Sequence, residues 1–84
     1  MTPSQFFKGR TVLVTGGAGA IGSNLVTSLL TLPVAKVHVL DDLTSAVPWN
    51  LPEDDRLVLQ VGSVCDPLEL KQAFADRPTV VFHL

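Results

Sequence analysis

The residues with the clearest chemistry are the glycines of the segment TGGAGAIGSNL, residues 15–25. Four of the six glycines in the chain lie within seven residues of this segment: Gly16, Gly17, Gly19 and Gly22. Because glycine has no Cβ, such a cluster lets a ligand or a second backbone approach the main chain closely. Where a glycine loop leads into a helix, the unpaired N–H groups of the first helical turn attract phosphate. The segment therefore predicts a phosphate-binding loop.

The spacing of the glycines fits two dinucleotide-binding patterns at once. G-x-G-x-x-G begins at Gly17, G-x-x-G-x-x-G begins at Gly16, and both end at Gly22. In either pattern an early glycine makes the turn, Gly19 lets a pyrophosphate touch the backbone, and Gly22 lets the helix pack against the strand. The alternative is a tight turn with close helix packing and no ligand. A P-loop is excluded, because no G-K-[S/T] follows.

The elements on either side of the loop favour binding over a bare turn. Residues 11–15 form an apolar, β-branched run without polar alternation, which predicts a strand buried on both faces. Residues 20–32 carry apolar side chains at helical spacing and end before Pro33. A helix beginning at Ala20 would turn its first N–H groups, those of Ala20 and Ile21, toward bound phosphates.

An acidic pair follows the second predicted strand, residues 36–40. Asp41 lies nineteen residues after Gly22, where an acidic side chain is expected to accept hydrogen bonds from the adenosine ribose hydroxyls. A carboxylate there would repel a 2′-phosphate, and residues 41–47 contain no Arg or Lys to bind one. The sequence therefore predicts NAD rather than NADP. For Asp42, an exposed turn at the strand end is the simpler interpretation.

The remaining elements continue the alternation of strands and helices. Residues 43–56 predict a loop, residues 57–61 a third strand, and residues 79–84 a fourth. Between the last two, a helix is expected to begin with Asp66 as its cap, Pro67 in its first position and Glu69 completing a capping box. This order indicates an α/β fold, the N-terminal portion of a Rossmann-like doubly wound parallel sheet with strand order 3-2-1-4.

Composition narrows the function classes. The 84 residues make one domain at most, and a net charge of −2 gives no support for nucleic-acid or anionic-membrane binding. A single cysteine, Cys65, suits a reducing compartment, and no targeting signal or 18-residue apolar run is visible, so a cytoplasmic protein is expected. His38 and His83 have no metal-ligand spacing and are predicted to be packed, hydrogen-bonded histidines.

Four blocks of the sequence resemble one known family. They are TGGAGAIGSNLV (residues 15–26), VLDDL (39–43), VGSVCD (61–66) and VVFHL (80–84). In this order they resemble the extended short-chain dehydrogenase/reductase family, more narrowly its NAD-dependent epimerase/dehydratase branch, which acts on nucleotide sugars. The resemblance covers about residues 9–84. It implies NAD as cofactor, a nucleotide-sugar substrate in a longer chain, and a homodimer at full length.

The resemblance also implies a set of cofactor-binding residues, grouped by the part of NAD they would meet. These are Gly16, Gly19, Ala20, Ile21 and Gly22 at the pyrophosphate, Asp41 and Asp42 at the adenosine ribose, Ser63 and Val64 at the adenine, and the backbone of Leu84 in the cofactor groove. Two positions depart from the family pattern. Ala20 stands where the family often has an aromatic residue, and Ser63 stands where it usually has Asp, so an uncharged acceptor would meet the adenine amino group.

The family's catalytic set is not in this sequence. Family members use a Tyr-x-x-x-Lys pair and a Ser or Thr on later elements, and this chain contains no tyrosine. The expected function is therefore the NAD-binding portion of a nucleotide-sugar epimerase/dehydratase, an enzyme by resemblance, with no catalytic residues of its own. The alternatives are a short non-catalytic NAD-binding or regulatory module and an inactive truncated product. With few helices to cover the sheet, the 84 residues alone are expected to be marginally folded.

Overall fold

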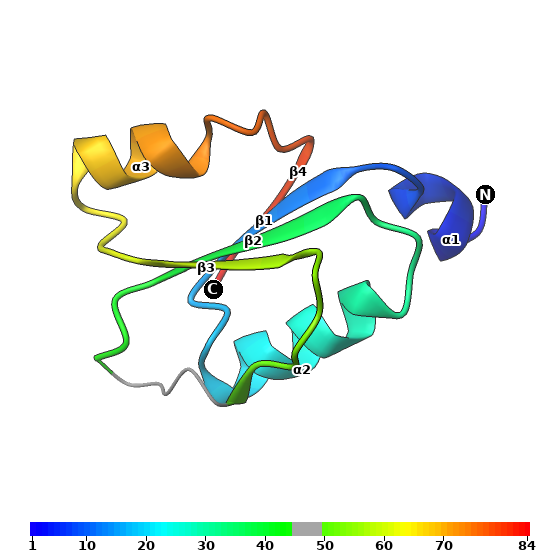
Figure 1. Ribbon diagram of the computed structural model, residues 1–84, viewed down its shortest axis with the longest axis horizontal. Coiled ribbons are helices and arrows are strands. Elements are labelled where there is room, and N and C mark those ends of the chain that lie inside the picture. The colour runs from blue at the N-terminus through cyan, green and yellow to red at the C-terminus, as the bar shows by residue number, and fades with distance from the viewer. Residues whose placement is uncertain (45–49) are drawn as a thin grey trace.

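Four parallel strands form the centre of the molecule, in the order β3-β2-β1-β4 (Figure 1). Their bounds are Thr11–Thr15 for β1, Lys36–Asp41 for β2, Leu57–Val61 for β3 and Val80–His83 for β4. The structure is a computed structural model that describes residues 1–44 and 50–84. It confirms the predicted fold class and strand order. Residues 45–49 of the predicted loop lie outside the described residues.

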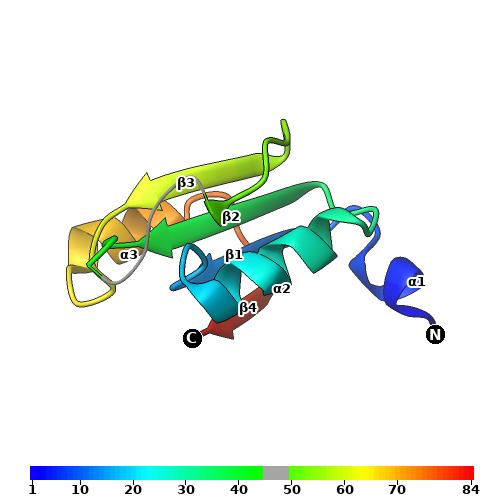
Figure 2. The same cartoon turned by 90° about the horizontal axis from the view of Figure 1, so that it is seen from below.

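The sheet is covered on both faces. Helix α2 (Ala20–Leu30) lies on one face and helix α3 (Pro67–Ala73) on the other (Figures 1 and 2). The side chains of β1 divide between the two layers, because alternate residues of a strand point to opposite faces. Val12 and Val14 pack with residues of α2, and Leu13 packs with Ala73 of α3. All three are fully buried, as expected for a central parallel strand.

Helix α2 ends at Leu30, two residues before the predicted end. Its last turn tightens, with the N–H of Leu32 bonded to the carbonyl of Leu29. The carbonyls of Leu30 and Leu32 instead accept from the guanidinium of Arg56, the residue directly before β3. This partner is distant in sequence, so the helical pattern of residues 20–32 could not show it.

Helix α3 begins as predicted, but without its capping box. The carboxylate of Asp66 accepts from the N–H of Leu68 at 3.0 Å, and Pro67 occupies the first helical position. The prediction that Glu69 completes the capping box is wrong, because the Glu69 carboxylate accepts from Gln60 Nε2 on β3 at 2.6 Å. A buried amide on the neighbouring strand therefore replaces the local partner.

A short helix, α1 (Pro3–Phe7), precedes β1 and was not predicted. Thr2 and Gln5 form a reciprocal capping box: the Gln5 N–H donates to the Thr2 hydroxyl, and the Thr2 N–H donates to the Gln5 side chain. The signal for this helix was present in the letters TPSQ, with proline in the first helical position. No helix of the described residues is long and apolar enough to cross a membrane.

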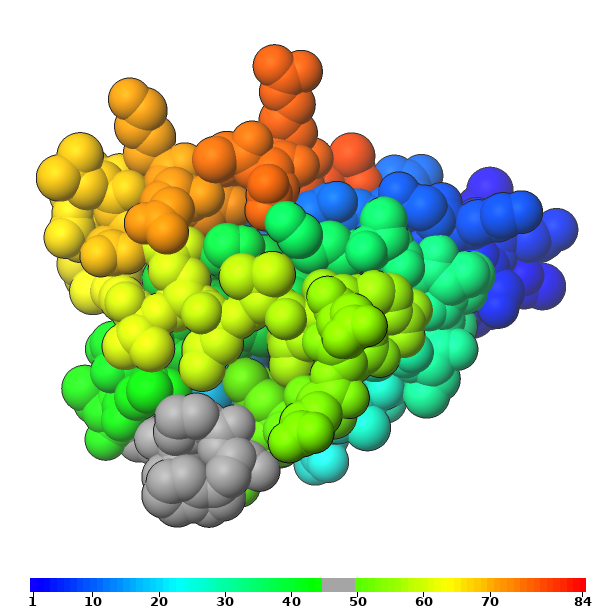
Figure 3. Space-filling model, viewed as in Figure 1, coloured from blue at the N-terminus to red at the C-terminus, as the bar shows by residue number. Residues whose placement is uncertain are grey.

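The edges of the sheet and its carboxyl end set the position of the site. Strand β3 forms one edge, and its partly buried side chains lie on the surface between α3 and α2 in Figure 3. Because the strands are parallel, their last residues meet at one end of the sheet: Thr15, Asp41, Val61 and His83. Open α/β sheets bind ligands at this end, where the loops leave the strands in opposite directions.

Candidate cofactor site

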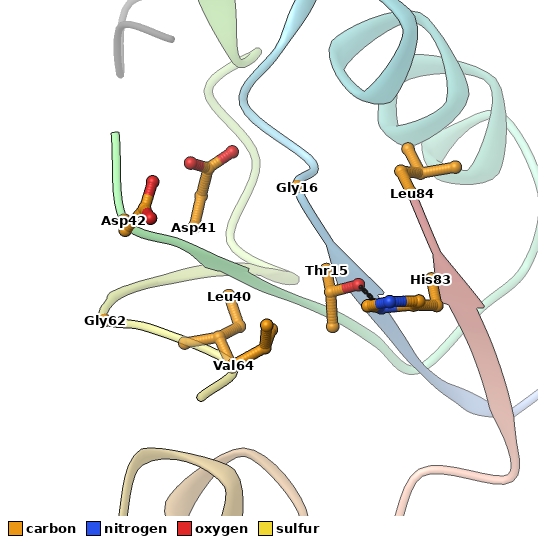
Figure 4. Close-up of a pocket in the computed structure, with 9 residues that line it drawn as sticks. All are labelled: Thr15, Gly16, Leu40, Asp41, Asp42, Gly62, Val64, His83 and Leu84. Atoms are coloured by element: carbon orange, nitrogen blue, oxygen red, sulfur yellow. Dashed lines mark hydrogen bonds between the residues drawn. The ribbon is translucent and has the colours of Figure 1, made fainter. Parts of the chain in front are cut away.

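Two adjoining hollows lie at the carboxyl end of the sheet. The first is a cleft of about 220 Å³, lined by Thr15, Gly16, Leu40, Asp41, Asp42, Gly62, Val64, His83 and Leu84 (Figure 4). The second, of about 440 Å³, is lined by Gly16, Gly19, Ala20, Ile21, Gly22 and Leu84. They share Gly16 and Leu84, so they form one continuous groove. Every predicted site residue except Ser63 lines one of the two.

Three glycines of the segment 15–25 are required by the fold itself. Gly16 has φ +75°, which side-chain-bearing residues rarely adopt. A Cβ at Gly17 would lie 2.7 Å from Val39 Cγ1 on β2, and a Cβ at Gly22 would collide with the carbonyl oxygen of Gly16. The sequence predicts a close approach of the helix to the strand at Gly22, and the second contact is an approach to the glycine loop directly after β1. These three positions would need glycine with or without a ligand.

Gly19 is different, because nothing in residues 1–44 and 50–84 requires its lack of a side chain. Its φ of −71° is ordinary for any residue, and an added Cβ would meet only the carbonyl oxygen of Gly16, at 3.6 Å. The space in front of it is the second hollow. An atom of a ligand, rather than an atom of the chain, would therefore come close to this backbone. The residues present fit a pyrophosphate at this position.

The start of α2 leaves hydrogen-bond donors facing this hollow. Gly19 is the N-cap residue, and no side chain caps the helix. The N–H of Ser23 is bonded to the Gly19 carbonyl, whereas within residues 1–44 and 50–84 no acceptor is found for the N–H groups of Ala20 and Ile21. Since the positive end of the helix dipole lies at the same place, this arrangement can bind an anion without a basic side chain.

Asp41 brings a carboxylate to the cleft from the end of β2. It is buried, with 8% of its surface exposed. Its Oδ2 accepts from the N–H of Ala18 at 3.0 Å, and its Oδ1 accepts from the N–H of Leu43 at 2.8 Å. Each carboxylate oxygen can accept a further hydrogen bond. Asp41 is therefore held in place by the backbone while it can still accept from the hydroxyls of a ribose.

Asp42 also lines the cleft, but it is exposed. Its Oδ1 accepts from the backbone N–H of Thr44 at 3.0 Å and from the Thr44 hydroxyl at 2.8 Å. These hydrogen bonds, the backbone one first, lower the pKa of Asp42 below its ordinary value. The side chain thus closes a turn at the strand end, in agreement with the simpler interpretation from the sequence.

The segment after β3 reaches the cleft through Gly62 and Val64, and not through Ser63. The Ser63 hydroxyl accepts from the N–H of Cys65 at 3.0 Å, which turns the chain toward α3. Its role at the adenine stays a prediction. Gly62 was missed by sequence reasoning, although a glycine directly after a strand is a signal of close approach.

His83 lines the cleft, and its surroundings differ from the prediction. Its Nδ1 lies 2.7 Å from the Thr15 hydroxyl, so the hydrogen bond is confirmed, but the side chain is exposed at the cleft rather than packed. His38 is buried and bonded to Gln60 Oε1 at 2.7 Å, as predicted for a core histidine. Among residues 1–44 and 50–84, no three His, Cys, Asp or Glu side chains are grouped to hold a metal ion.

The sequence model of the NAD dependent epimerase/dehydratase family matches residues 12–84. The chain belongs to this family. Epimerase Mth375 of Methanothermobacter thermautotrophicus shares 43% identity and a TM-score of 0.90, over 96% of this chain and 24% of its own. WbmF of Bordetella bronchiseptica, in complex with NAD+, shares 40% identity and a TM-score of 0.85, over 94% of this chain and 24% of its own.

The dTDP-glucose 4,6-dehydratase of Neisseria gonorrhoeae is 36% identical over 80 residues, which are 89% of this chain and 23% of that enzyme. The chain thus spans about a quarter of the length of the family members that it matches. The resemblance stated from the four sequence blocks is confirmed, and NAD as the predicted cofactor agrees with the description of the family.

Proposed function

We propose that this chain is the NAD-binding portion of an epimerase or dehydratase that acts on a nucleotide sugar. One observation carries the proposal: the open backbone at Gly19 and the buried carboxylate of Asp41 lie on one continuous groove at the carboxyl end of the sheet. The first suits a pyrophosphate and the second suits the adenosine ribose, so the two together match the shape and polarity of a dinucleotide.

Each part of the groove has its own task in this proposal. The N–H groups of Ala20 and Ile21 donate to the pyrophosphate, and Asp41 accepts from the ribose hydroxyls. The adenine lies along Gly62 and Val64, and the end of β4 at Leu84 forms the opposite wall. When bound, NAD supplies the hydride acceptor for the reaction.

The charge at the end of β2 favours NAD over NADP. A 2′-phosphate would lie close to the Asp41 carboxylate, and Asp42 adds a second negative charge on the same cleft. No Lys or Arg lies among residues 41–44, which are the last residue of β2 and the described residues directly after it. Electrostatic repulsion without a basic partner therefore opposes the additional phosphate.

The nucleotide-sugar substrate is proposed from the relatives. The Neisseria enzyme is named for dTDP-glucose, and WbmF has also been solved with NAD+ and UDP. The acid/base tyrosine and lysine of such an enzyme would have to come from outside these 84 residues, since the chain contains no tyrosine. A non-catalytic NAD-binding module is the second candidate, because the cofactor residues are present here without those catalytic groups.

The proposal can be tested by isothermal titration calorimetry with NAD and with NADP. The protein is expressed for this purpose from its complete reading frame. We expect saturable binding of NAD and at least about tenfold weaker binding of NADP. Absence of NAD binding, or a preference for NADP, would contradict it. A reading frame with a downstream Tyr-x-x-x-Lys favours the enzyme, and one without it favours the module.

A further inference from the structure

His38, the buried histidine of β2, has one ring nitrogen without a hydrogen-bond partner. Its Nε2 lies 2.7 Å from Gln60 Oε1 on β3, whereas its buried Nδ1 has no hydrogen-bond partner among residues 1–44 and 50–84. Buried polar atoms in folded proteins are almost always hydrogen-bonded. The Oδ2 of Asp76 lies 3.8 Å from Nδ1, just beyond hydrogen-bonding distance. His38 and Asp76 are therefore close enough to interact, but they do not share a hydrogen bond.

The hydrogen bonds of Gln60 determine where the proton of a neutral His38 lies. Gln60 Nε2 donates to the Glu69 carbonyl at 3.0 Å and to the Glu69 carboxylate at 2.6 Å, so its Oε1 is the atom that meets His38. Because this oxygen can only accept, His38 Nε2 donates to it and Nδ1 keeps a free lone pair. Nδ1 and the Asp76 carboxylate are then both acceptors. A proton added at Nδ1 would supply the missing donor.

The charged groups around His38 come from three parts of the fold. Lys36, on the same strand, donates to Asp76 Oδ2 at 2.7 Å. Asp76 lies in the turn that leads from α3 to β4 (Figure 1). Glu69, on α3, is bonded to Gln60. The residues paired with His38 on β1 and β3 carry no charge: Leu13 and Val58. A protonated His38 would therefore have Asp76 as its anionic partner and Lys36 as a competing cation.

Asp76 is suited to accept from a protonated ring. The hydrogen bond from Lys36, and then the charge of Lys36, lower the pKa of Asp76 below its ordinary value of 3.8, so the carboxylate is ionised throughout the range in which histidines change charge. Its side chain is 42% exposed. The carboxylate therefore has room to move the roughly 1 Å toward Nδ1 that a hydrogen bond requires.

We propose that His38 and Asp76 form a proton-linked contact between β2 and the turn after α3. A proton bound at Nδ1 converts two facing acceptors into an ion pair, and the positive charge of Lys36 opposes its uptake. Proton uptake draws the turn onto the sheet, and proton release loosens it, so the docking of α3 depends on pH. The inference is independent of NAD, since none of these three residues lines the cofactor groove.

Nuclear magnetic resonance of the protein from its complete reading frame, with ¹⁵N-labelled histidine, reports which ring nitrogens carry protons. The signals that are absent from His38→Gln belong to His38. Between pH 8 and pH 5, where histidines change charge, we expect a change from a proton on Nε2 alone to protons on both nitrogens. A ring that is still neutral at pH 5, or that carries its single proton on Nδ1 at pH 8, would overturn the inference.

Two substitutions should shift this titration in opposite directions. Asp76→Asn removes the anion and should lower the proton affinity of His38 at least about threefold, whereas Lys36→Met removes the competing cation and should raise it by about the same factor. Asp55→Asn is the matched control, because Asp55 is exposed and forms no side-chain hydrogen bond or ion pair among the described residues. It should leave the titration unchanged. An unchanged titration in Asp76→Asn would contradict the proposal.

The pH dependence of stability provides a second measurement, which needs no assignment of signals. Between pH 8 and pH 5, Asp76→Asn loses the ion pair with Lys36 to the same extent at every pH. Because only the unaltered protein can also pair a protonated His38 with Asp76, the ratio of the two unfolding equilibrium constants should grow by up to the same threefold or more as pH falls. Denaturant unfolding at each pH measures this ratio. A constant or shrinking ratio would give Asp76 a structural role alone and exclude the proton-linked contact.

Discussion

The carboxylate of Asp41 accepts a hydrogen bond from the backbone N–H of Ala18 at 3.0 Å, which ties the end of β2 to the glycine loop. A second bond, from the Leu43 N–H at 2.8 Å, holds the other carboxylate oxygen. The side chain proposed to bind the ribose therefore also shapes the loop proposed to bind the pyrophosphate. In the proposed function, binding and local folding are therefore coupled through one residue.

Replacing Asp41 by Asn should affect both properties. The amide keeps only one acceptor oxygen, so either Ala18 or Leu43 loses its partner, and the free energy of unfolding should fall by about 1–2 kcal/mol. Affinity for NAD should fall about tenfold, and the preference for NAD over NADP should shrink because the negative charge is removed. Denaturant unfolding and titration with both cofactors measure these changes.

Asp42→Asn is the control for this substitution. Asp42 carries the same charge on the same cleft, but it is exposed and bonded only within its own turn. Its replacement should change NAD affinity less than about threefold, the usual scale for an exposed charge. Equal effects of the two substitutions would mean that Asp41 acts through net charge alone and not as a specific acceptor.

Gly19 and Gly22 should respond in opposite ways to replacement by alanine. Gly22→Ala forces a Cβ against the Gly16 carbonyl, so we expect a loss of roughly 3 kcal/mol or more in stability. Gly19→Ala meets no close atom and should change stability by about 1 kcal/mol at most, yet weaken NAD binding by at least about tenfold. Thermal unfolding with and without NAD distinguishes the two. If the Gly19→Ala protein binds NAD normally, the pyrophosphate does not lie against the backbone of Gly19.

The parts of this structure that were predictable are those encoded locally. The strands read as buried because their apolar residues are consecutive, and the crossover rule then fixes their order. Asp66 was recognised as a cap because its partner, the Leu68 N–H, is two residues away. At the glycine loop, the spacing and the flanking elements together indicated the ligand.

The errors arose where a partner comes from a distant segment. Glu69 was assigned to its own helix but bonds to Gln60 on β3, and α2 ends early where Arg56 takes its last carbonyls. His83 was expected to be packed as well as hydrogen-bonded, but as the last residue of β4 it opens onto the cleft, which the sequence of a single strand cannot show. These contacts depend on register and packing between elements, which local patterns do not contain.

Acid should weaken the contact between β3 and α2. Arg56, by hydrogen bonding first and by charge second, lowers the pKa of Asp54 below its ordinary value of 3.8. A group whose pKa is lower in the folded state stabilises the fold above its unfolded pKa and loses that effect as pH falls through the folded pKa. The melting temperature should therefore be insensitive to this pair above about pH 5 and fall below pH 4.

Asp54→Asn should flatten this acid decline, while Asp55→Asn should leave it unchanged. Asp55 is exposed and forms no side-chain hydrogen bond or ion pair among the described residues, so it is a matched control one position away. Melting curves at pH 3, 4, 5 and 7 for the three proteins provide the measurement. An equally steep decline in Asp54→Asn would assign acid sensitivity to other carboxylates, such as Asp76 beside Lys36.

Among the polar residues on the face of the sheet that α3 covers, Gln60 should lose the most stability when it is replaced. Its amide nitrogen donates to the backbone carbonyl of Glu69 at 3.0 Å and to the Glu69 carboxylate at 2.6 Å. The amide oxygen must therefore face His38, and because that oxygen can only accept, His38 Nε2 carries the proton of their 2.7 Å hydrogen bond. One buried side chain thus satisfies partners on a strand and on a helix.

Gln60→Leu keeps the approximate volume but leaves the buried Nε2–H of His38 without its acceptor. Burying an unsatisfied donor costs about 1–3 kcal/mol, so unfolding should require correspondingly less denaturant. Gln72→Leu, on the exposed surface of α3, is the matched control and should stay within about 0.5 kcal/mol of the unaltered protein. Since Gln60 lines neither hollow of the groove, NAD affinity measured well below the unfolding transition should be unchanged. A Gln60→Leu protein as stable as the Gln72→Leu control would show that the His38 contact contributes no net stability.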